Sequence, residues 1–435
     1  MPGARSLEAI LGALEGLGMR LGLAPFAARL AALGHPERDL PAVVVAGTNG
    51  KGSVASLLAA MLRGAGYRAG LYTSPHLESP TERIRVDGRA IAETRLALLL
   101  EEVLAAGDGK LEPPTYFEAL TAAALLEFSR SALDCAVLEV GLGGRLDATN
   151  LAETRLTVVS PIALDHEAIL GSTLGEIARE KAGIFRPGIP AILAAQEPEA
   201  RRALDVRARE IGAPVVDAAR GVRWLSDPGA RPLGLASARA SYRLSIALAG
   251  RHQADNVATA VVAAEILAER GFRSLDATAI ERGAAAWRWP GRLETVVLPP
   301  PAPEVLFDAA HNPAGATTLA AHWRALGGRG TLLFGALADK RIDRMLPALA
   351  ACADRIVLTR PDSARAAAPE DLRALVPGAL SCAVEPHIDA ALDLALAGEP
   401  RRVVIGGSLF LAGAARRALR LRYGLPPPPG PTFVE

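Results

Sequence analysis

Short apolar runs alternate with amphipathic stretches along most of the chain. Apolar runs predict buried strands at residues 42–46, 134–140 and 156–162, and a further strand is predicted at 67–73. Stretches with helical periodicity lie around them, at residues 6–33, 54–63, 93–106, 115–130 and 177–184. Because strands and helices follow one another in this order, the pattern predicts an α/β fold with a parallel sheet.

The second half of the chain repeats the alternation. After helical stretches within residues 255–286, strands are predicted at 304–308, 331–334, 355–359 and 402–405. At 435 residues the chain is too long for one comfortable core, so we expect at least two domains. We place them at 1–290 and 297–435, joined by a hinge at 291–296 that follows a Trp- and Pro-rich stretch.

Two segments carry no clear element pattern. Residues 74–85 are too polar and irregular for a helix or strand, and a loop of this kind beside a binding site usually moves or binds. Residues 425–431 form a proline-rich tail that we expect to be extended.

The loop Gly47-Thr48-Asn49-Gly50-Lys51-Gly52-Ser53 joins the first strand to a helix. Its three glycines allow backbone N–H groups to approach phosphate oxygens closely, the helix contributes its positive N-terminus, and the lysine adds a full charge. The spacing departs from the common P-loop motif, because Val45 and Gly52 stand where that motif has its first Gly and its Ser or Thr. We interpret the loop as a nucleotide-phosphate site.

Composition excludes several classes of function. The net charge is +1 and acids and bases interleave, so nothing favours binding to nucleic acid or to an anionic membrane. No uncharged apolar stretch approaches the ~20 residues of a membrane span, and we expect a cytoplasmic protein. Cys135, Cys352 and Cys382 are too few and too scattered for a disulfide framework or a zinc site.

Asn and Lys are rare in this arginine-rich chain. The four asparagines are at positions 49, 150, 256 and 312, and the four lysines at 51, 110, 181 and 340. An amide both donates and accepts, and a lysine amine can lose its proton and react where a guanidinium cannot. These positions are therefore candidates for specific chemistry, although a turn residue or a surface lysine is the ordinary alternative for each.

Polar side chains follow three of the predicted strands. Glu139 interrupts a buried run near its carboxyl end, Asp165 and His166 follow the next run along the chain, and Ser74 ends another. A buried carboxylate is costly unless it meets a cation, and open α/β sheets hold ligands at the carboxyl ends of their strands. We therefore predict Mg²⁺ ligands at this edge. The run at 141–146 lacks the last glycine of a dinucleotide fingerprint, so that alternative is disfavoured.

Spaced motifs in the same order resemble the folylpolyglutamate synthase and dihydrofolate synthase family of the Mur ligase superfamily, most closely its bifunctional bacterial members. The quoted blocks are 47–53, 74–77, 138–150, 164–166, 180–184, 250–256, 289–294, 308–313 and 407–409. The resemblance implies a P-loop NTPase-like parallel sheet flanked by helices, with a smaller Rossmann-like α/β domain after it. It also implies ATP-dependent formation of an amide between L-glutamate and dihydropteroate, a (poly)glutamylated reduced folate, or both, through an acyl phosphate.

The resemblance also implies roles for single residues. ATP would be held by Thr48, Asn49, Gly50, Lys51, Gly52, Ser53, Asn256, Arg292 and Asp308. One Mg²⁺ would meet Ser74 and Glu139, and a second would meet His166 and a carbamylated Lys181, with K⁺ as a further candidate cofactor. The pterin substrate would contact Thr115, Phe117, Leu146, Asp147 and Ala148. His311 and Ser408 are our choices for the incoming glutamate, and Lys181, His166 and His311 for catalysis.

Two other functions remain as alternatives. Another Mur-type amino acid ligase is disfavoured by the block at 146–150, and a non-catalytic nucleotide-binding protein needs neither the rare Lys181 nor a second domain. Two departures from the family pattern are Ala309, where glycine is common, and Arg341, where an acid is usual. The expected partners are the small-molecule substrates, and we expect a monomer.

Overall fold

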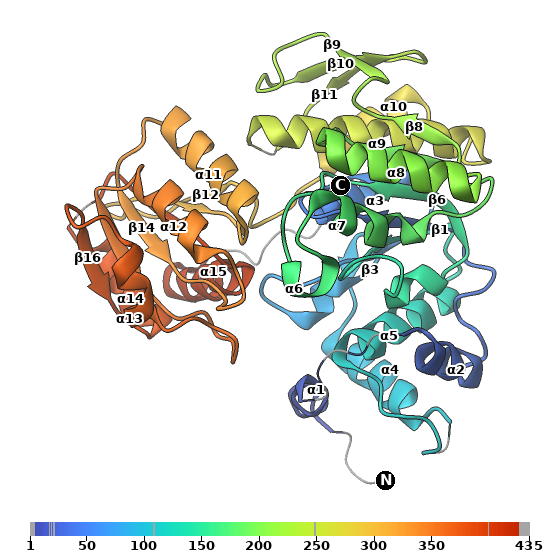
Figure 1. Ribbon diagram of the computed structural model, residues 1–435, viewed down its shortest axis with the longest axis horizontal. Helices are drawn as coiled ribbons and strands as arrows, with labels where there is room; N and C mark the ends of the chain where they lie inside the picture. The colour runs from blue at the N-terminus through green and yellow to red at the C-terminus, as the bar shows by residue number, and fades with distance from the viewer. Residues whose placement is uncertain are drawn as a thin grey trace.

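Two large sheets, each with helices on both faces, lie side by side in the computed structural model (Figure 1). The structure describes residues 5–16, 18, 20, 22–107, 109–247, 249–398 and 400–425. The proline-rich tail predicted at 425–431 lies outside the described residues beyond Leu425.

The first sheet has eight strands in the order β4-β3-β2-β5-β1-β6-β7-β8. All neighbours from β2 to β8 are parallel, while β3 and β4 form an antiparallel edge. Its strands are β1 Ala42–Ala46, β2 Ala69–Tyr72, β3 Ile84–Val86, β4 Arg89–Ala90, β5 Cys135–Glu139, β6 Thr154–Val159, β7 Ala191–Leu193 and β8 Val215–Asp217.

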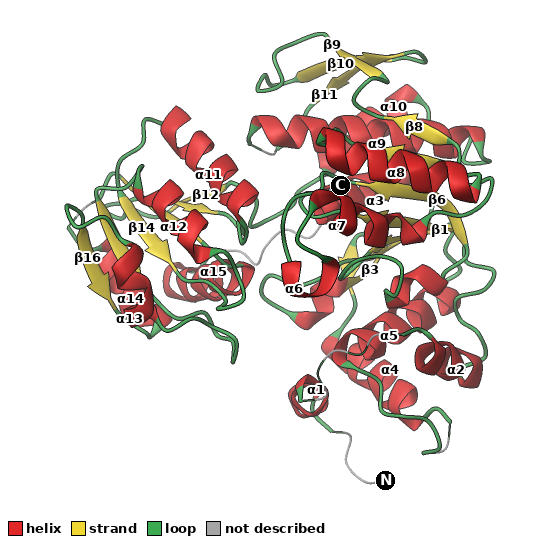
Figure 2. Cartoon of the chain, in the orientation of Figure 1, coloured by secondary structure: helices red, strands yellow, loops and turns green. Residues whose placement is uncertain are grey.

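Helices cover both faces of this sheet (Figure 2). Along β1, Val43 and Val45 face one core while Val44 and Ala46 face another, because successive side chains of a strand point to opposite faces. The first face carries α3 Lys51–Gly64, α9 Arg251–Glu269 and α10 Ala277–Ala286. The opposite face carries α1 Leu7–Glu15, α2 Ala24–Ala32, α4 Glu93–Ala105, α5 Tyr116–Arg130, α7 Leu174–Lys181 and α8 Pro198–Ile211.

Shorter elements complete this part of the chain. A three-stranded antiparallel sheet consists of β9 Val222–Trp224, β10 Leu233–Ser237 and β11 Ser241–Leu244. The short helices are α6 Glu167–Leu170 and the 3₁₀ turns η1 Pro80–Arg83, η2 Ala148–Leu151 and η3 Ala182–Ile184.

The C-terminal sheet has six strands in the order β12-β13-β17-β14-β15-β16, parallel except for the pair β12–β13. The strands are β12 Glu294–Val297, β13 Glu304–Phe307, β14 Thr331–Phe334, β15 Arg355–Leu358, β16 Ser381–Val384 and β17 Arg402–Gly406. Its helices are α11 Pro313–Ala325, α12 Ile342–Ala350, α13 Pro369–Leu372, α14 Ile388–Leu396 and α15 Leu409–Tyr423, with the turn η4 Arg373–Leu375.

The predicted α/β class with two parallel-type sheets is confirmed, whereas several local predictions were wrong. Residues 74–85 are not entirely irregular, because Ser79 caps η1 and Ile84 then pairs with Tyr72 in the antiparallel edge. The first long helix begins at Lys51 rather than at Val54. Strands β3, β4, β7–β12 and β16 were not predicted, since most are short or only partly apolar.

One seam of contact joins the two parts of the molecule at α15. A Cβ on Gly413 of this helix would lie 1.8 Å from the carbonyl oxygen of Leu77, so the helix backbone packs directly on the 74–79 loop. Beside it, Arg416 pairs with Glu78 at 2.5 Å and with Glu294 at 2.9 Å. The loop that follows β2 is therefore held by the C-terminal helix.

Among the described helices, none is both long and apolar enough to cross a membrane.

Candidate active site

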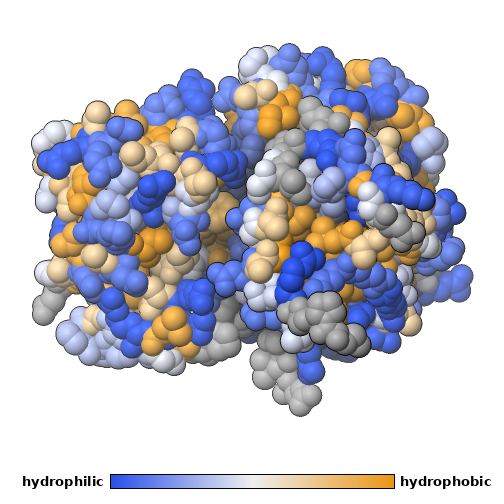
Figure 3. Space-filling view, turned by 90° about the horizontal axis from the view of Figure 1, so that it is seen from below, coloured by the Kyte–Doolittle hydropathy of each residue, from blue (hydrophilic) through white to orange (hydrophobic). Residues whose placement is uncertain are grey.

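A cavity of about 2010 Å³ lies along the boundary between the two parts. Figure 3 views the molecule from below, where the surface is hollowed between two lobes. Every residue for which the sequence predicted a site role lines this one cavity. The phosphate loop, the strand-end carboxylate, the pterin-pocket candidates and the residues of the C-terminal part therefore face a common space.

The phosphate loop is held in a conformation that requires glycine at two positions. Gly47 has φ 138°, and a Cβ there would lie 1.9 Å from Ser160 Oγ. Gly50 has φ 85°, and a Cβ there would lie 2.3 Å from Asn256 Oδ1. The loop packs directly against the end of β6 and against α9, so a side chain at either position would clash.

Two polar groups of this loop are suited to an anionic ligand. Lys51 begins α3, and its Nζ donates to the carbonyl oxygen of Thr48 at 3.2 Å. The Ser53 hydroxyl is buried and has no hydrogen-bond partner in the part of the chain that the structure describes. A buried hydroxyl without a partner at a helix N-terminus fits a site that is completed by a bound phosphate.

Glu139 ends β5 beside the loop and is 5% exposed. Burial raises the pKa of its carboxyl, while Lys51 and the hydrogen bond from Ser74 N lower it. Ser74 N donates to one carboxylate oxygen at 3.1 Å, so the serine and the glutamate are adjacent as predicted. The pair fits a Mg²⁺ ion that takes one carboxylate and completes its shell with hydroxyl, water and phosphate oxygens.

Lys181 is buried at the end of α7 with 4% of its surface exposed. Its Nζ donates to the carbonyl oxygen of Gly47 at 2.7 Å. Burial and the charge of Lys51 lower the pKa of this amine to about 7. A substantial fraction of Lys181 is therefore a neutral, nucleophilic amine at neutral pH.

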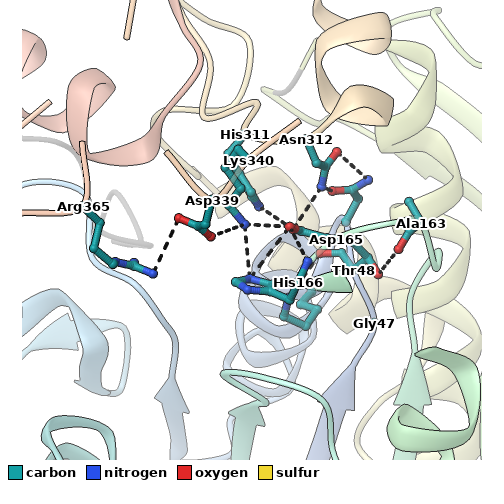
Figure 4. A network of polar contacts seen from close by, with 12 residues as sticks. Gly47, Thr48, Ala163, Asp165, His166, His311, Asn312, Asp339, Lys340 and Arg365 are labelled. Carbon is teal, nitrogen blue, oxygen red and sulfur yellow. Dashed lines mark hydrogen bonds and ion pairs between the residues drawn. The ribbon is translucent and has the colours of Figure 1, made fainter. Parts of the chain in front are cut away.

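Asp165 is the centre of a polar network that crosses the boundary (Figure 4). Lys340 Nζ pairs with Asp165 Oδ1 at 2.6 Å, and His311 Nε2 lies 3.4 Å from Asp165 Oδ2. Burial alone would raise the pKa of Asp165, but His311 and Lys340 hold it well below its usual range. Asp165 is thus an anion that attracts two residues of the C-terminal part.

His166 contacts a cation in this structure. Lys340 Nζ lies 3.3 Å from its Nε2. Burial lowers the pKa of His166 to about 4 despite the nearby Asp165. The neutral ring suits a metal ligand, but its Nε2 faces an ammonium, and no group of three or more His, Cys, Asp or Glu suited to a metal occurs among the described residues. The predicted second metal site would need Lys340 to move.

Asn49 and Asn312 join the phosphate loop to the C-terminal part. Asn312 Nδ2 donates to Asn49 Oδ1 at 2.8 Å, and Asn312 Oδ1 caps α11 by accepting from Gly315 N at 2.9 Å. An amide can donate on one side and accept on the other, which explains why an otherwise asparagine-poor chain has one at each position.

The predicted pterin pocket lies at the start of α5 and in the loop after β5. Thr115 caps α5, accepting from Glu118 N at 3.2 Å, so its hydroxyl already has a structural partner. The Phe117 ring lies on Gly141, where a Cβ would approach it to 2.6 Å. Asp147 accepts from Gly141 N and from the Thr149 hydroxyl. These bonds set the cavity wall that Leu146 and Ala148 also line.

The remaining predicted residues are partly engaged by the fold. Asp308 accepts from Leu293 N at 2.9 Å and Ala310 N at 2.8 Å, and burial raises its pKa against the charge of Arg292. Asn256 Nδ2 donates to Gln253 Oε1 at 3.0 Å, and Ser408 caps α15. Arg292 lines the cavity and donates only to the adjacent Gly291 carbonyl among the described residues.

Three residues of this site were noted in the sequence but were given no individual role there. Asp165, Lys340 and Asn312 form the network across the boundary. The scarcity of Lys and Asn marks two of them in the sequence, whereas Asp is common in this chain and nothing distinguished Asp165 from its neighbour His166.

Known proteins are similar to this chain over most of its length. Residues 45–264 match the Mur ligase middle domain and residues 291–409 the Mur ligase glutamate ligase domain. The Bacillus subtilis dihydrofolate synthase/folylpolyglutamate synthase is 35% identical over 415 residues, which are 93% of this chain and 96% of that protein.

Two solved structures are also similar. Escherichia coli FolC in complex with DHPP and ADP has a TM-score of 0.85 and 33% identity, covering 97% of this chain and 100% of the other. The Yersinia pestis bifunctional folylpolyglutamate synthase/dihydrofolate synthase, complexed with AMPPNP and Mn ion, has a TM-score of 0.83 and 30% identity, covering 97% and 100%.

Proposed function

Because the chain belongs to the dihydrofolate synthase/folylpolyglutamate synthase family of Mur ligases and is an ATP-dependent glutamate ligase, we propose that it has both activities of its bifunctional relatives. It would join L-glutamate to dihydropteroate and to a (poly)glutamylated reduced folate. The observation that carries the proposal is the single cavity that holds every predicted ATP, metal, pterin and glutamate residue.

ATP would bind with its phosphates on the loop at residues 48–53. The unpartnered hydroxyl of Ser53 and the N-terminus of α3 support this placement. Lys51 would exchange its present bond to the Thr48 carbonyl for a phosphate oxygen. Asn256, Arg292 and Asp308 would contact the rest of the nucleotide from the α9 side and from the C-terminal part.

A divalent ion, Mg²⁺ in our proposal, would be held by Glu139 and Ser74 together with phosphate oxygens. The adjacency of the two residues and the burial of Glu139 support this donor set. When bound, the ion would neutralise the charge that develops as the γ-phosphoryl group is transferred. A second ion at His166 and Lys181 belongs to the same proposal.

The chemistry in this proposal consists of two displacements. A carboxylate oxygen of the acceptor attacks the γ-phosphorus, the bond between the γ-phosphorus and the bridging oxygen breaks, and ADP leaves. The neutral amine of glutamate then attacks the carbonyl carbon of the acyl phosphate. The amide C–N bond forms as the bond between the acyl carbon and the bridging oxygen breaks. Phosphate leaves with that oxygen, and the amine nitrogen loses a proton. His311, which lies beside Asp165, is our candidate for holding the glutamate or taking this proton, and Ser408 lines the same end.

We further propose that Lys181 is carbamylated. The nucleophilic neutral amine would attack CO₂, and the product carries a carboxylate that Arg could not provide. The burial of Lys181 and its pKa of about 7 support this modification.

Closure would occur about residues 291–296, between domains at 1–290 and 297–435. The bonds from Gly291 N to Glu294 and from Leu293 N to Asp308 order this segment and support its use as a pivot. Closing the cavity excludes water from a hydrolysable acyl phosphate. We also propose that the protein is a cytoplasmic monomer without nucleic-acid or membrane partners. K⁺ is a further cofactor in this proposal.

The test is ADP release with and without glutamate. We expect glutamate-dependent release with dihydropteroate and also with tetrahydrofolate, and an amide product from each. Release with only one acceptor would contradict bifunctionality, and release that ignores glutamate would contradict the ligase assignment.

A further inference from the structure

Arg83 is a buried cation for which none of the proposed roles accounts. It ends η1, and only 6% of its surface is exposed. Its carbonyl oxygen accepts from Thr73 N at 3.0 Å, which fixes its backbone beside the end of β2. A buried guanidinium is expected to meet a carboxylate or a set of oxygen acceptors.

The side chain of Arg83 has only uncharged partners among the described residues. Its Nε donates to His76 Nδ1 at 3.0 Å, and its guanidinium lies 5.2 Å from the centroid of the Tyr116 ring. Because His76 Nδ1 accepts this hydrogen bond, it carries no proton, and the imidazole brings no negative charge to the guanidinium. A neutral imidazole and a ring face hold the cation in place without neutralising it.

Other buried arginines of this chain differ from Arg83 in their partners or in their position relative to the cavity. Arg29, 3% exposed, donates to the carbonyl oxygens of Val103 and Glu112, and Arg416 pairs with two glutamates. Arg85, two residues after Arg83, donates to the Glu82 carbonyl and is not part of the cavity wall. Arg83 does line the cavity, so a guanidinium without an ion-pair partner among the described residues faces a space that a ligand can enter.

The position of Arg83 indicates which ligand its guanidinium would bind. On one side lies Tyr116, between the pterin-pocket candidates Thr115 and Phe117. Glu139 is linked to Arg83 through the end of β2, because Thr73 N donates to the Arg83 carbonyl and Ser74 N donates to Glu139. A pteroate carries its pterin at one end and its carboxylate at the other. A pterin on Phe117 would leave the carboxylate to reach toward Arg83, which lines the same cavity as Glu139 and the phosphate loop.

We propose that Arg83 receives the carboxylate of the pterin-containing acceptor, positioned by His76 and Tyr116. The inference rests on the proposed function and adds a specificity residue to it. An arginine fork binds a carboxylate through two parallel hydrogen bonds. The positive charge of Arg83 would also offset the repulsion between this carboxylate and the γ-phosphate. It would also make the site discriminate between an acid and a neutral analogue of equal shape.

The experiment measures equilibrium binding of two probes, pteroate and its neutral carboxamide, to wild type and to Arg83→Met without nucleotide. Wild type is expected to bind the acid about 10- to 100-fold more tightly than the amide, the range of a charge-assisted hydrogen bond. Arg83→Met is expected to lower affinity for the acid to that of the amide, leaving amide binding and ATP affinity unchanged. Arg85→Met is the matched control and should keep the wild-type preference.

Each other outcome is decisive. A wild-type preference for the acid that survives in Arg83→Met would overturn the proposal, as would a loss of ATP affinity with the acid preference intact, which would assign Arg83 to the nucleotide. If the methionine variant is unfolded by its Tm, Arg83→Gln, which keeps a donor for His76, gives the same test. Wild type that binds neither probe would instead count against the proposed function, since no pterin site would then exist.

Discussion

Lys181 Nζ lies 2.7 Å from the carbonyl oxygen of Gly47, so the reactive amine of α7 is bonded to the first residue of the phosphate loop. If Lys181 acts as a carbamate, Lys181→Ala should lower turnover by about 10- to 100-fold, as loss of a group that orients a metal typically does. Lys181→Arg should not restore it, because a guanidinium keeps the charge but cannot take up CO₂. Steady-state kinetics of both variants check this, and wild-type turnover in the arginine variant would refute carbamylation.

The carbamate should also depend on pH in a defined direction. Burial lowers the pKa of Lys181 to about 7, so the amine is mainly protonated below that pH and mainly neutral above it. Since only the neutral amine attacks CO₂, occupancy should rise between about pH 6 and pH 8. Carbon-13 NMR of protein equilibrated with labelled bicarbonate measures it, with Lys181→Ala as the blank. A carbamate signal that falls over this range would contradict the assignment.

The close approach of α15 to the loop after β2 predicts a large effect of one methyl group. Gly413→Ala would place a Cβ 1.8 Å from the Leu77 carbonyl oxygen, so the helix and the loop must separate. Although alanine favours helix, we expect a net destabilisation of about 1–3 kcal/mol and reduced turnover, because this loop carries Ser74.

Gly378→Ala is the control for that variant, because a Cβ there meets nothing within 4 Å. Thermal unfolding and turnover of the two variants should therefore differ. Equal stability and activity would mean that the helix and the loop do not pack together in solution.

The ion pairs of α15 should be unequal in energy. The side chains of Arg416 and Glu78 are 9% and 6% exposed, and removing one partner of a buried pair typically costs about 3–5 kcal/mol. On the same helix, Arg422 pairs with Asp393, whose side chain is 65% exposed, and such pairs contribute about 0–1 kcal/mol. Arg416→Met should lower the free energy of unfolding far more than Arg422→Met. If denaturant unfolding showed similar losses of stability for both variants, the ion pairs of Arg416 with Glu78 and Glu294 would be exposed to solvent.

The sequence predicted the parts of the fold that depend on local pattern. Continuous apolar runs marked β1, β5 and β6, and the motifs marked loops at their ends. Strand β3 was not predicted because its residues are stabilised by pairing with β2, which is a relationship between segments rather than a pattern within one. Short strands such as β7 and β9 are too brief to show a period.

For the site, chemistry predicted which residues face the cavity but not their partners. Rarity pointed to Lys181, Asn49 and Asn312, and all three have specific polar contacts. The structure adds that Lys340 meets Asp165 and His166, which the spacing of these residues in the sequence cannot indicate. Arg83 was hidden for the opposite reason, because arginine is abundant in this chain.

The most direct test of the proposed acyl phosphate follows the oxygen atoms of the acceptor carboxylate. Dihydropteroate with both carboxylate oxygens labelled as ¹⁸O is incubated with the enzyme, ATP and glutamate, and the released phosphate is analysed by mass spectrometry. Because one carboxylate oxygen attacks the γ-phosphorus and departs with it, we expect one ¹⁸O atom in each phosphate and one in the new amide. Amide formation with unlabelled phosphate would contradict an acyl phosphate, and with it the role assigned to this cavity.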